Sequence, residues 1–145
     1  MEVQQDSDEA RGARIQRTLA MLRDGTVIVE GAHDVRTLRL LGINAVPYPG
    51  LSAVLERKTR GKFYVMTDND RGGEEKRSKI VSMLLETNSG SAIDEVTGRR
   101  MLNMLNVTCV EQVYGPVQEA LEKGNGDYFG KDIPGYCKVH GSGKV

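Results

Sequence analysis

Three carboxylates stand where they can carry out metal-assisted chemistry. Glu30 directly follows an apolar run at residues 26–29. Asp68 and Asp70 follow a second apolar run, and because side chains alternate along an extended backbone, both point to one side and Asn69 to the other. Several carboxylates at one edge repel one another unless a cation neutralises them. Mg²⁺ suits hard oxygen ligands at an open site. We therefore predict that Glu30, Asp68 and Asp70 are catalytic and bind Mg²⁺, with Mn²⁺ able to replace it.

Other chemistries fit the spacing of these acids less well. An EF-hand loop that begins at Asp68 requires a glutamate at its twelfth position, where Lys79 stands. A phosphatase-type nucleophile at Asp68 would belong on the first strand of the sheet, but an earlier strand already ends in Glu30, so this is a minor alternative. Alternatively, the acidic residues after the second apolar run form only a turn that caps the next helix. The candidate zinc ligands are scattered and do not favour a zinc site: Cys109, Cys137, His33 and His140.

Glycines and basic residues beside the acids suit a phosphate group. A helix is expected to begin just after Asp70, and its free N–H groups and positive dipole end attract anions. Residues 57–79 hold eight basic and four acidic residues, whereas the whole chain has twenty of each. The alternative is a solvated helix face with Glu75 and Lys79 paired. The residues that we assign to phosphate binding are Gly31, Arg71, Gly72, Gly73 and Lys76.

Three further residues near this site have weaker assignments. Asp34 lies one helical turn beyond Glu30, where it would support the edge of the site or bind the metal through water. His33 is close enough to Glu30 in sequence to carry protons, although an exposed first-turn histidine is the commoner explanation. Tyr48 follows the second expected strand and would either stack on a base or seal the core.

Strands that alternate with helices are needed to bring these residues together. Such alternation implies crossover connections and an α/β fold, Rossmann-like, with about four strands in a mainly parallel sheet and helices on both faces. Ligands bind such sheets at the carboxyl ends of the strands. The expected strands are residues 26–29, 44–47, 62–66 and 107–110. The expected helices are residues 7–23, 32–41, about 52–58, about 71–85, about 94–105 and a segment after Pro116.

Length and composition are typical of one globular domain. The chain has 145 residues, 39% of them hydrophobic, with a net charge of zero. We expect an N-terminal helix within residues 1–24 packed on a domain of residues 25–123, followed by an irregular glycine-rich strap or tail at 124–145. The first residues do not form a secretory signal, the apolar runs are too short to span a membrane, and two cysteines do not make a disulfide framework. These features predict a cytoplasmic protein without a membrane partner.

Two motifs in this order resemble the Toprim domain. The first is Val27-Ile28-Val29-Glu30-Gly31-x-x-Asp34, and the second is Tyr64-Val65-Met66-Thr67-Asp68-Asn69-Asp70-Arg71-Gly72-Gly73-Glu74. The Toprim domain is shared by type IA and type II topoisomerases, bacterial primases, overcoming-lysogenisation-defect nucleases, recombination-repair proteins and the 5S ribosomal RNA maturation nuclease. The resemblance covers about residues 25–123 and implies a Rossmann-like Toprim fold.

The resemblance also implies roles for the acids. Glu30 would act as a metal ligand or general acid/base at the scissile phosphate, and Asp68 and Asp70 would coordinate Mg²⁺. The second motif ends in Asp-Arg-Gly-Gly-Glu where type IA topoisomerases have Asp-Arg-Glu-Gly-Glu, so Gly72 replaces a carboxylate. In size and in its residues 107–121 the chain is similar to the maturation nuclease and to small stand-alone Toprim proteins.

The expected function is a Mg²⁺-dependent phosphodiester enzyme, most simply a small nuclease that acts on RNA rather than DNA. A chain of 145 residues has no room for the tyrosine-bearing domain of a topoisomerase or the zinc and helicase-binding domains of a primase. The alternative is a non-catalytic, metal-assisted nucleic-acid binding or adaptor module that works with a protein partner. A partner that supplies a missing nucleophile domain is a third hypothesis.

Overall fold

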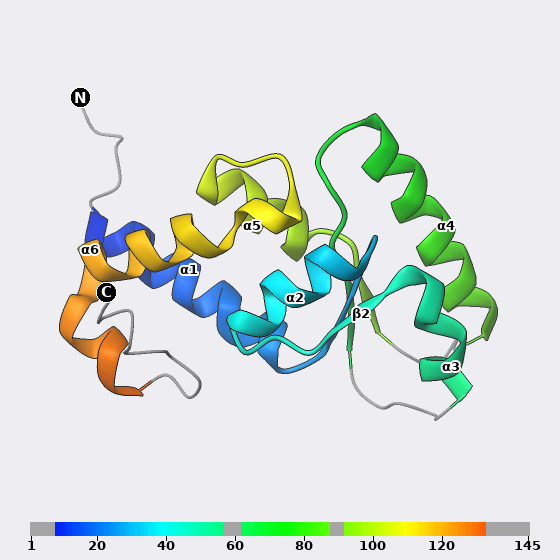
Figure 1. Ribbon diagram of the computed structural model, residues 1–145, viewed down its shortest axis with the longest axis horizontal. Coiled ribbons are helices and arrows are strands. Elements are labelled where there is room, and N and C mark those ends of the chain that lie inside the picture. The colour runs from blue at the N-terminus through cyan, green and yellow to red at the C-terminus, as the bar shows by residue number, and fades with distance from the viewer. Residues whose placement is uncertain (1–7, 57–61, 88–91, 133–145) are drawn as a thin grey trace.

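A computed structural model of the chain describes residues 8–56, 62–87 and 92–132. A four-stranded sheet lies between two groups of helices (Figure 1), and its strands pair in parallel. The order across the sheet is β2-β1-β3-β4. The predicted α/β class and parallel sheet are therefore confirmed. The strands are β1 (Thr26–Val29), β2 (Ala45–Pro47), β3 (Phe63–Val65) and β4 (Ile93–Asp94).

The inner strands β1 and β3 end side by side at one edge of the sheet. Ile28 pairs with Val65, and the N–H of Met66 donates to the carbonyl of Ile28 at 2.9 Å. Because this register continues past both strands, Glu30 follows β1 at the level of Thr67 after β3. All four residues of β1 are buried, as expected for a short β-branched run with neighbours on both edges and helices on both faces.

Helices cover both faces of the sheet (Figure 1). Val27 and Val29 of β1 join the larger core cluster with α1, α2, α5 and α6, whereas Ile28 joins the smaller cluster with α3 and α4. This division follows from the alternation of side chains along a strand. The helices are α1 (Asp8–Arg23), α2 (Ala32–Leu40), α3 (Leu51–Glu56), α4 (Arg71–Thr87), α5 (Thr97–Leu105) and α6 (Tyr114–Asp132), with 3-10 helices η1 (Tyr48–Gly50) and η2 (Val110–Gln112).

The N-terminal helix α1 is part of the main core. Its predicted apolar stripe, Ile15, Leu19 and Leu22, is completely buried or nearly so. The stripe belongs to the same core cluster as Val117 and Leu121 of α6. The helix therefore closes one face of the domain together with α5 and α6.

The segment 107–110 is not a strand, contrary to the prediction. Its residues form a loop that leads into η2, and the N–H of Asn69 donates to the carbonyl of Thr108 at 2.8 Å. Val110 is fully buried in the larger core cluster, so the apolar run reflects burial and not strand pairing. The fourth strand is β4, which pairs with β3. A two-residue strand in a polar stretch has too little alternation to be recognised from sequence.

The last described helix is longer than predicted. Irregular structure was expected from Gly124, but α6 continues to Asp132. Extending a helix that is already anchored by packing costs far less than nucleating a new one, which explains why glycines are tolerated there. The rest of the expected strap, residues 133–145, lies outside the described residues. No helix in the described part of the chain is long and apolar enough to cross a membrane.

Candidate functional site

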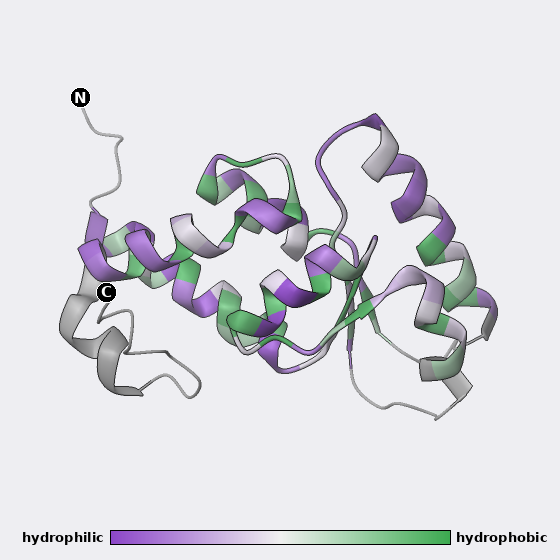
Figure 2. Cartoon of the chain, in the orientation of Figure 1, coloured by the Kyte–Doolittle hydropathy of each residue, from purple (hydrophilic) through white to green (hydrophobic). Residues whose placement is uncertain are grey.

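Glu30 and Asp68 lie in contact although 38 positions separate them. The N–H of Asp68 donates to Oε2 of Glu30 at 2.9 Å. This contact follows from the adjacent ends of β1 and β3. The Glu30 side chain keeps 20% of its surface exposed, and the loop from β3 into α4 is hydrophilic (Figure 2). The structure thus brings two of the predicted site residues together at an accessible edge.

Asp70 caps α4. Its Oδ1 accepts a hydrogen bond from the N–H of Gly73 at 2.7 Å, and its carbonyl accepts from the N–H of Glu74 at 3.0 Å. A Cβ on Gly73 would lie 1.8 Å from the carbonyl oxygen of Asp68, so only glycine allows α4 to begin against this backbone. A Cβ on Gly72 would make only an ordinary contact, 3.6 Å from Oδ1 of Asp70. The capping-turn alternative therefore describes part of what Asp70 does.

Asp34 stabilises the start of α2. Gly31 is the N-cap residue of this helix, and the Asp34 carboxylate accepts a hydrogen bond from its N–H. This is one half of a capping box, with aspartate in place of glutamate. The position of a Cβ on Gly31 has no neighbour within 4 Å. The Asp34 carboxylate therefore holds the first turn of α2, and the space beside the Gly31 Cα is open.

Five carboxylates form what we call the carboxylate cluster. Burial raises the pKa of Asp68 above its ordinary value, and the negative charges of Glu30 and Asp70 raise it further. Burial likewise raises the pKa of Asp34, with the charge of Asp68 as the next cause. The charge of Glu111 adds to both pKa shifts. The cluster consists of Glu30, Asp34, Asp68, Asp70 and Glu111.

Residues of the loop before α6 contribute to the site and were missed by sequence reasoning. The N–H of Val110 donates to Oδ1 of Asp68 at 2.9 Å and holds the pKa of Asp68 down against the effect of burial. Nδ2 of Asn69 donates to Oδ1 of Asn103 on α5 at 3.2 Å. A signal for Glu111 was present, because it directly follows the run predicted as the fourth strand, just as Glu30 follows the first. No sequence pattern indicated the contacts that Val110 and Asn103 make.

One of the predicted basic residues contacts the cluster. Nζ of Lys76 lies 3.7 Å from Oε1 of Glu30. Arg71 is the first residue of α4 and is exposed. His33 is exposed, and its Nδ1 is 2.8 Å from Nη2 of Arg36 on the same helix. The structure therefore places Lys76 on the cluster, leaves Arg71 beside it, and pairs His33 with an arginine and not with a carboxylate.

The donor set suits a hard divalent cation, but its members do not converge. Within the residues that the structure describes, no group of three or more His, Cys, Asp or Glu side chains is arranged to hold a metal ion. Glu30 uses both oxygens, one with Asp68 and one with Lys76. Asp68 and Asp70 each use Oδ1, and no described hydrogen bond reaches their Oδ2 atoms. Mg²⁺ needs only one or two direct carboxylates because it keeps several waters, so this chemistry fits.

Comparisons with known proteins give information about the fold alone. No family model matches the sequence, and no curated protein matches it. Among solved structures, the chain is similar to an uncharacterised protein from Aquifex aeolicus, with 25% sequence identity and a TM-score of 0.54. The match covers 68% of this chain and 93% of that chain. Most of the Aquifex chain therefore shares this arrangement of strands and helices.

Proposed function

We propose that the protein is a Mg²⁺-dependent phosphodiester enzyme, a small Toprim-like nuclease that acts on RNA in the cytoplasm. The observation that carries the proposal is the hydrogen bond from the N–H of Asp68 to Glu30, which joins the two acidic motifs. The raised pKa of Asp68 supports it, because burial and then the neighbouring charges of Glu30 and Asp70 disfavour the carboxylate form, and a bound cation would offset both. RNA is preferred over DNA on the resemblance to the ribosomal RNA maturation nuclease.

Each residue has a role in this proposal. Asp68 and Asp70 would hold the cation with their Oδ2 atoms, and Mg²⁺ bound there would polarise the phosphate. Glu30 would accept and return a proton, for which its partly exposed position is suitable. The guanidinium of Arg71 and the free N–H groups at the start of α4 would hold the phosphate. Lys76 would leave Glu30 for the phosphate when substrate binds.

The test is cleavage of structured RNA and of DNA with the same sequence, in Mg²⁺ and in EDTA. We expect cleavage of RNA that requires Mg²⁺ and that falls by about 10²-fold or more in Glu30→Gln. Glu119→Gln is the matched control, since this glutamate lies on α6 with 68% of its side chain exposed and pairs with Lys123. Cleavage that persists in Glu30→Gln would assign the activity elsewhere and refute the proposal.

A second function, metal-assisted binding without turnover, is favoured by a specific observation. Lys76 neutralises Glu30, and the carboxylates in the described part of the chain do not converge on one point. An adaptor that presents nucleic acid to a partner protein needs neither a proton carrier nor a complete metal site. RNA binding that survives Glu30→Gln, together with no cleavage by the parent, would support this second function.

A further inference from the structure

A groove with a strongly basic lining lies between α1 and α5, apart from the carboxylate cluster. Its volume is about 720 Å³, within the range of sites that hold a small ligand. We call it the α1–α5 groove. The residues that matter for its chemistry are Arg14, Arg17, Met21, Arg100, Asn103 and Met104.

The charges that the described residues bring to the α1–α5 groove are of one sign. Among these residues, three arginines line the groove and no carboxylate does. Arg11, Arg14 and Arg17 are spaced by three positions on α1, so each is a neighbour of the next on the helix surface. Nη2 of Arg11 donates to the carbonyl of Met104 at 2.8 Å, which fixes α1 against α5. Arg17 and Arg100 are exposed, and no hydrogen bond or ion pair of their side chains is found among the described residues. This lining would attract a polyanion.

The groove also offers apolar surface. Ala20, Met21 and Met104 line it, and Met21 has 43% of its surface exposed. Inorganic phosphate would gain no binding energy from apolar surface, whereas a nucleotide carries a flat base as well as a charged phosphate. Methionine side chains adapt in shape and make favourable contacts with aromatic rings. Cations and apolar surface side by side are what a stacked base and its phosphate require.

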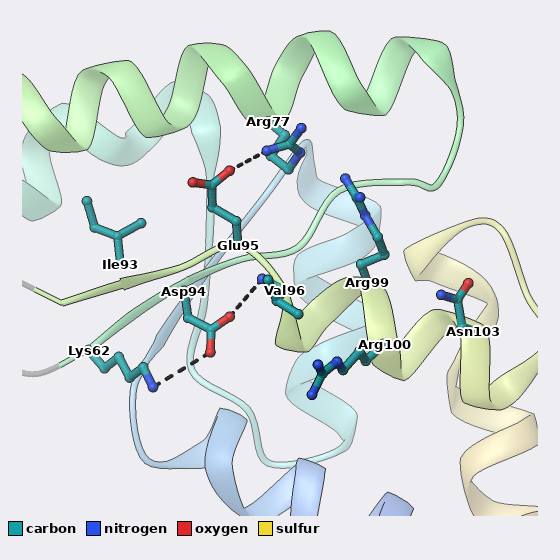
Figure 3. A pocket seen from close by; sticks show the side chains of 9 residues that line it. All are labelled: Lys62, Arg77, Ile93, Asp94, Glu95, Val96, Arg99, Arg100 and Asn103. Carbon is teal, nitrogen blue, oxygen red and sulfur yellow. Dashed lines mark hydrogen bonds and ion pairs between the residues drawn. The ribbon is translucent and has the colours of Figure 1, made fainter.

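A second hollow adjoins the α1–α5 groove. It has a volume of about 690 Å³ and shares Arg100 and Asn103 with the α1–α5 groove. Figure 3 shows Arg99 reaching from α5 toward Arg77 of α4, with Arg100 pointing away from them. Asn103 bonds to Asn69, which stands between the two aspartates of the cluster. Asn103 therefore lines both hollows and also contacts the loop that carries the two aspartates.

We propose that the α1–α5 groove binds a single-stranded nucleic-acid segment, with phosphates on Arg17 and Arg100 and bases against Met21 and Met104. The segment is single-stranded because bases in a duplex are stacked on one another and do not present their faces to side chains. The choice of nucleic acid as the ligand rests on the proposed function, but binding in the groove requires neither a metal ion nor the carboxylate cluster.

The experiment measures binding of a fluorescent twelve-nucleotide unpaired RNA by anisotropy in EDTA, where no cleavage occurs. We expect Arg17→Gln/Arg100→Gln to weaken binding about tenfold or more, and the slope of log affinity against log salt to fall by about 1.4, since each lost phosphate contact removes about 0.7. Arg17→Lys/Arg100→Lys should restore most of the slope. Met21→Ala should weaken binding severalfold without changing the slope. Thermal melting checks that each variant is folded.

The matched control removes two positive charges elsewhere. Arg39 on α2 and Lys123 on α6 are exposed and line neither hollow. Arg39→Gln/Lys123→Gln should bind RNA nearly as the parent does. Equal losses in both double variants would show only nonspecific attraction and overturn the proposal. A twelve-residue polyglutamate that competes as well as the RNA would overturn it in favour of an acidic protein partner, and equally tight duplex binding would overturn the single-strand preference.

The outcomes separate this proposal from the proposed function. RNA binding that depends on Arg17 and Arg100, with no cleavage under any condition, would support the groove and refute the nuclease. Cleavage that requires Glu30, with binding unaffected in Arg17→Gln/Arg100→Gln, would support the nuclease and refute the groove.

Discussion

Replacing Gly73 by alanine tests whether a backbone contact positions the candidate site. The added Cβ would lie 1.8 Å from the carbonyl oxygen of Asp68 and 2.7 Å from its carbonyl carbon. Because real Cβ contacts essentially never fall under 3.0 Å, the first turn of α4 must move from 1.8 Å to at least 3.0 Å, which is about 1.2 Å. The clashing atoms are backbone atoms, so no side-chain rotation relieves the contact.

The movement should lower stability by a measurable amount. Overpacking of this kind costs about 1–3 kcal/mol, and disturbing the 2.7 Å cap between the Gly73 N–H and Asp70 costs about 1 kcal/mol more. We therefore expect the free energy of unfolding in urea to fall by about 2–4 kcal/mol. For a domain of this size, each kcal/mol corresponds to about 4 °C, so Tm should fall by roughly 10 °C.

The adjacent glycine provides the control. A Cβ on Gly72 would make an ordinary contact at 3.6 Å, and alanine restricts the unfolded chain more than glycine does. Gly72→Ala should therefore leave stability unchanged or raise it by up to about 1 kcal/mol. If Gly73→Ala and Gly72→Ala both melt with the parent, the close approach of α4 to Asp68 is wrong, and with it the position assigned to the aspartates.

Three further predictions concern capping, pH and metal. Asp94→Ala removes the acceptor of two backbone N–H groups at the start of α5, one of them from Thr97, so unfolding in urea at pH 7 should require about 1–2 kcal/mol less. Burial alone would raise the pKa of Asp94, but its hydrogen bonds from Thr97 and Val96 lower the pKa below its ordinary value. The difference in unfolding free energy between the parent and Asp94→Ala should therefore shrink as the pH falls below about 4. Burial raises the pKa of Asp34, so ionising this carboxylate costs the folded parent stability as the pH rises from about 4 to that raised pKa. Asp34→Asn lacks this contribution, so the free energy of unfolding of the variant should rise relative to that of the parent between about pH 4 and 7. Mg²⁺ at a hundred times its Kd should stabilise the parent by about 2.7 kcal/mol in calorimetry and Asp68→Asn by much less; equal shifts would contradict a site at Asp68.

Local sequence patterns were sufficient for most helices and for the central strand. The run at residues 26–29 is short, β-branched and flanked by glycines, and β1 has those bounds. The stripe Ile15, Leu19 and Leu22 repeats at helical spacing, and α1 buries it. Such patterns succeed because burial on one face or on both leaves a periodic trace in the residues themselves.

The edge of the sheet was not predictable in the same way. Residues 107–110 and β3 are both short apolar runs, but only β3 has a neighbouring strand with which to pair. The pairing of β4 depends on the position of Phe63 beside Ile93, which are 30 positions apart in the chain. Strand pairing is a long-range contact, so an apolar run by itself does not predict it.

The sequence by itself determined which carboxylates stand after buried strands, because a parallel sheet presents the ends of its strands at one edge. Only the tertiary structure decided what those carboxylates contact. The N–H of Val110 reaches Asp68 across 42 positions, Asn103 reaches Asn69 across 34, and the groove joins α1 to α5, which are far apart in the sequence. Periodicity arises from neighbours along the chain, whereas these contacts arise from the packing of the whole core, which no local pattern records.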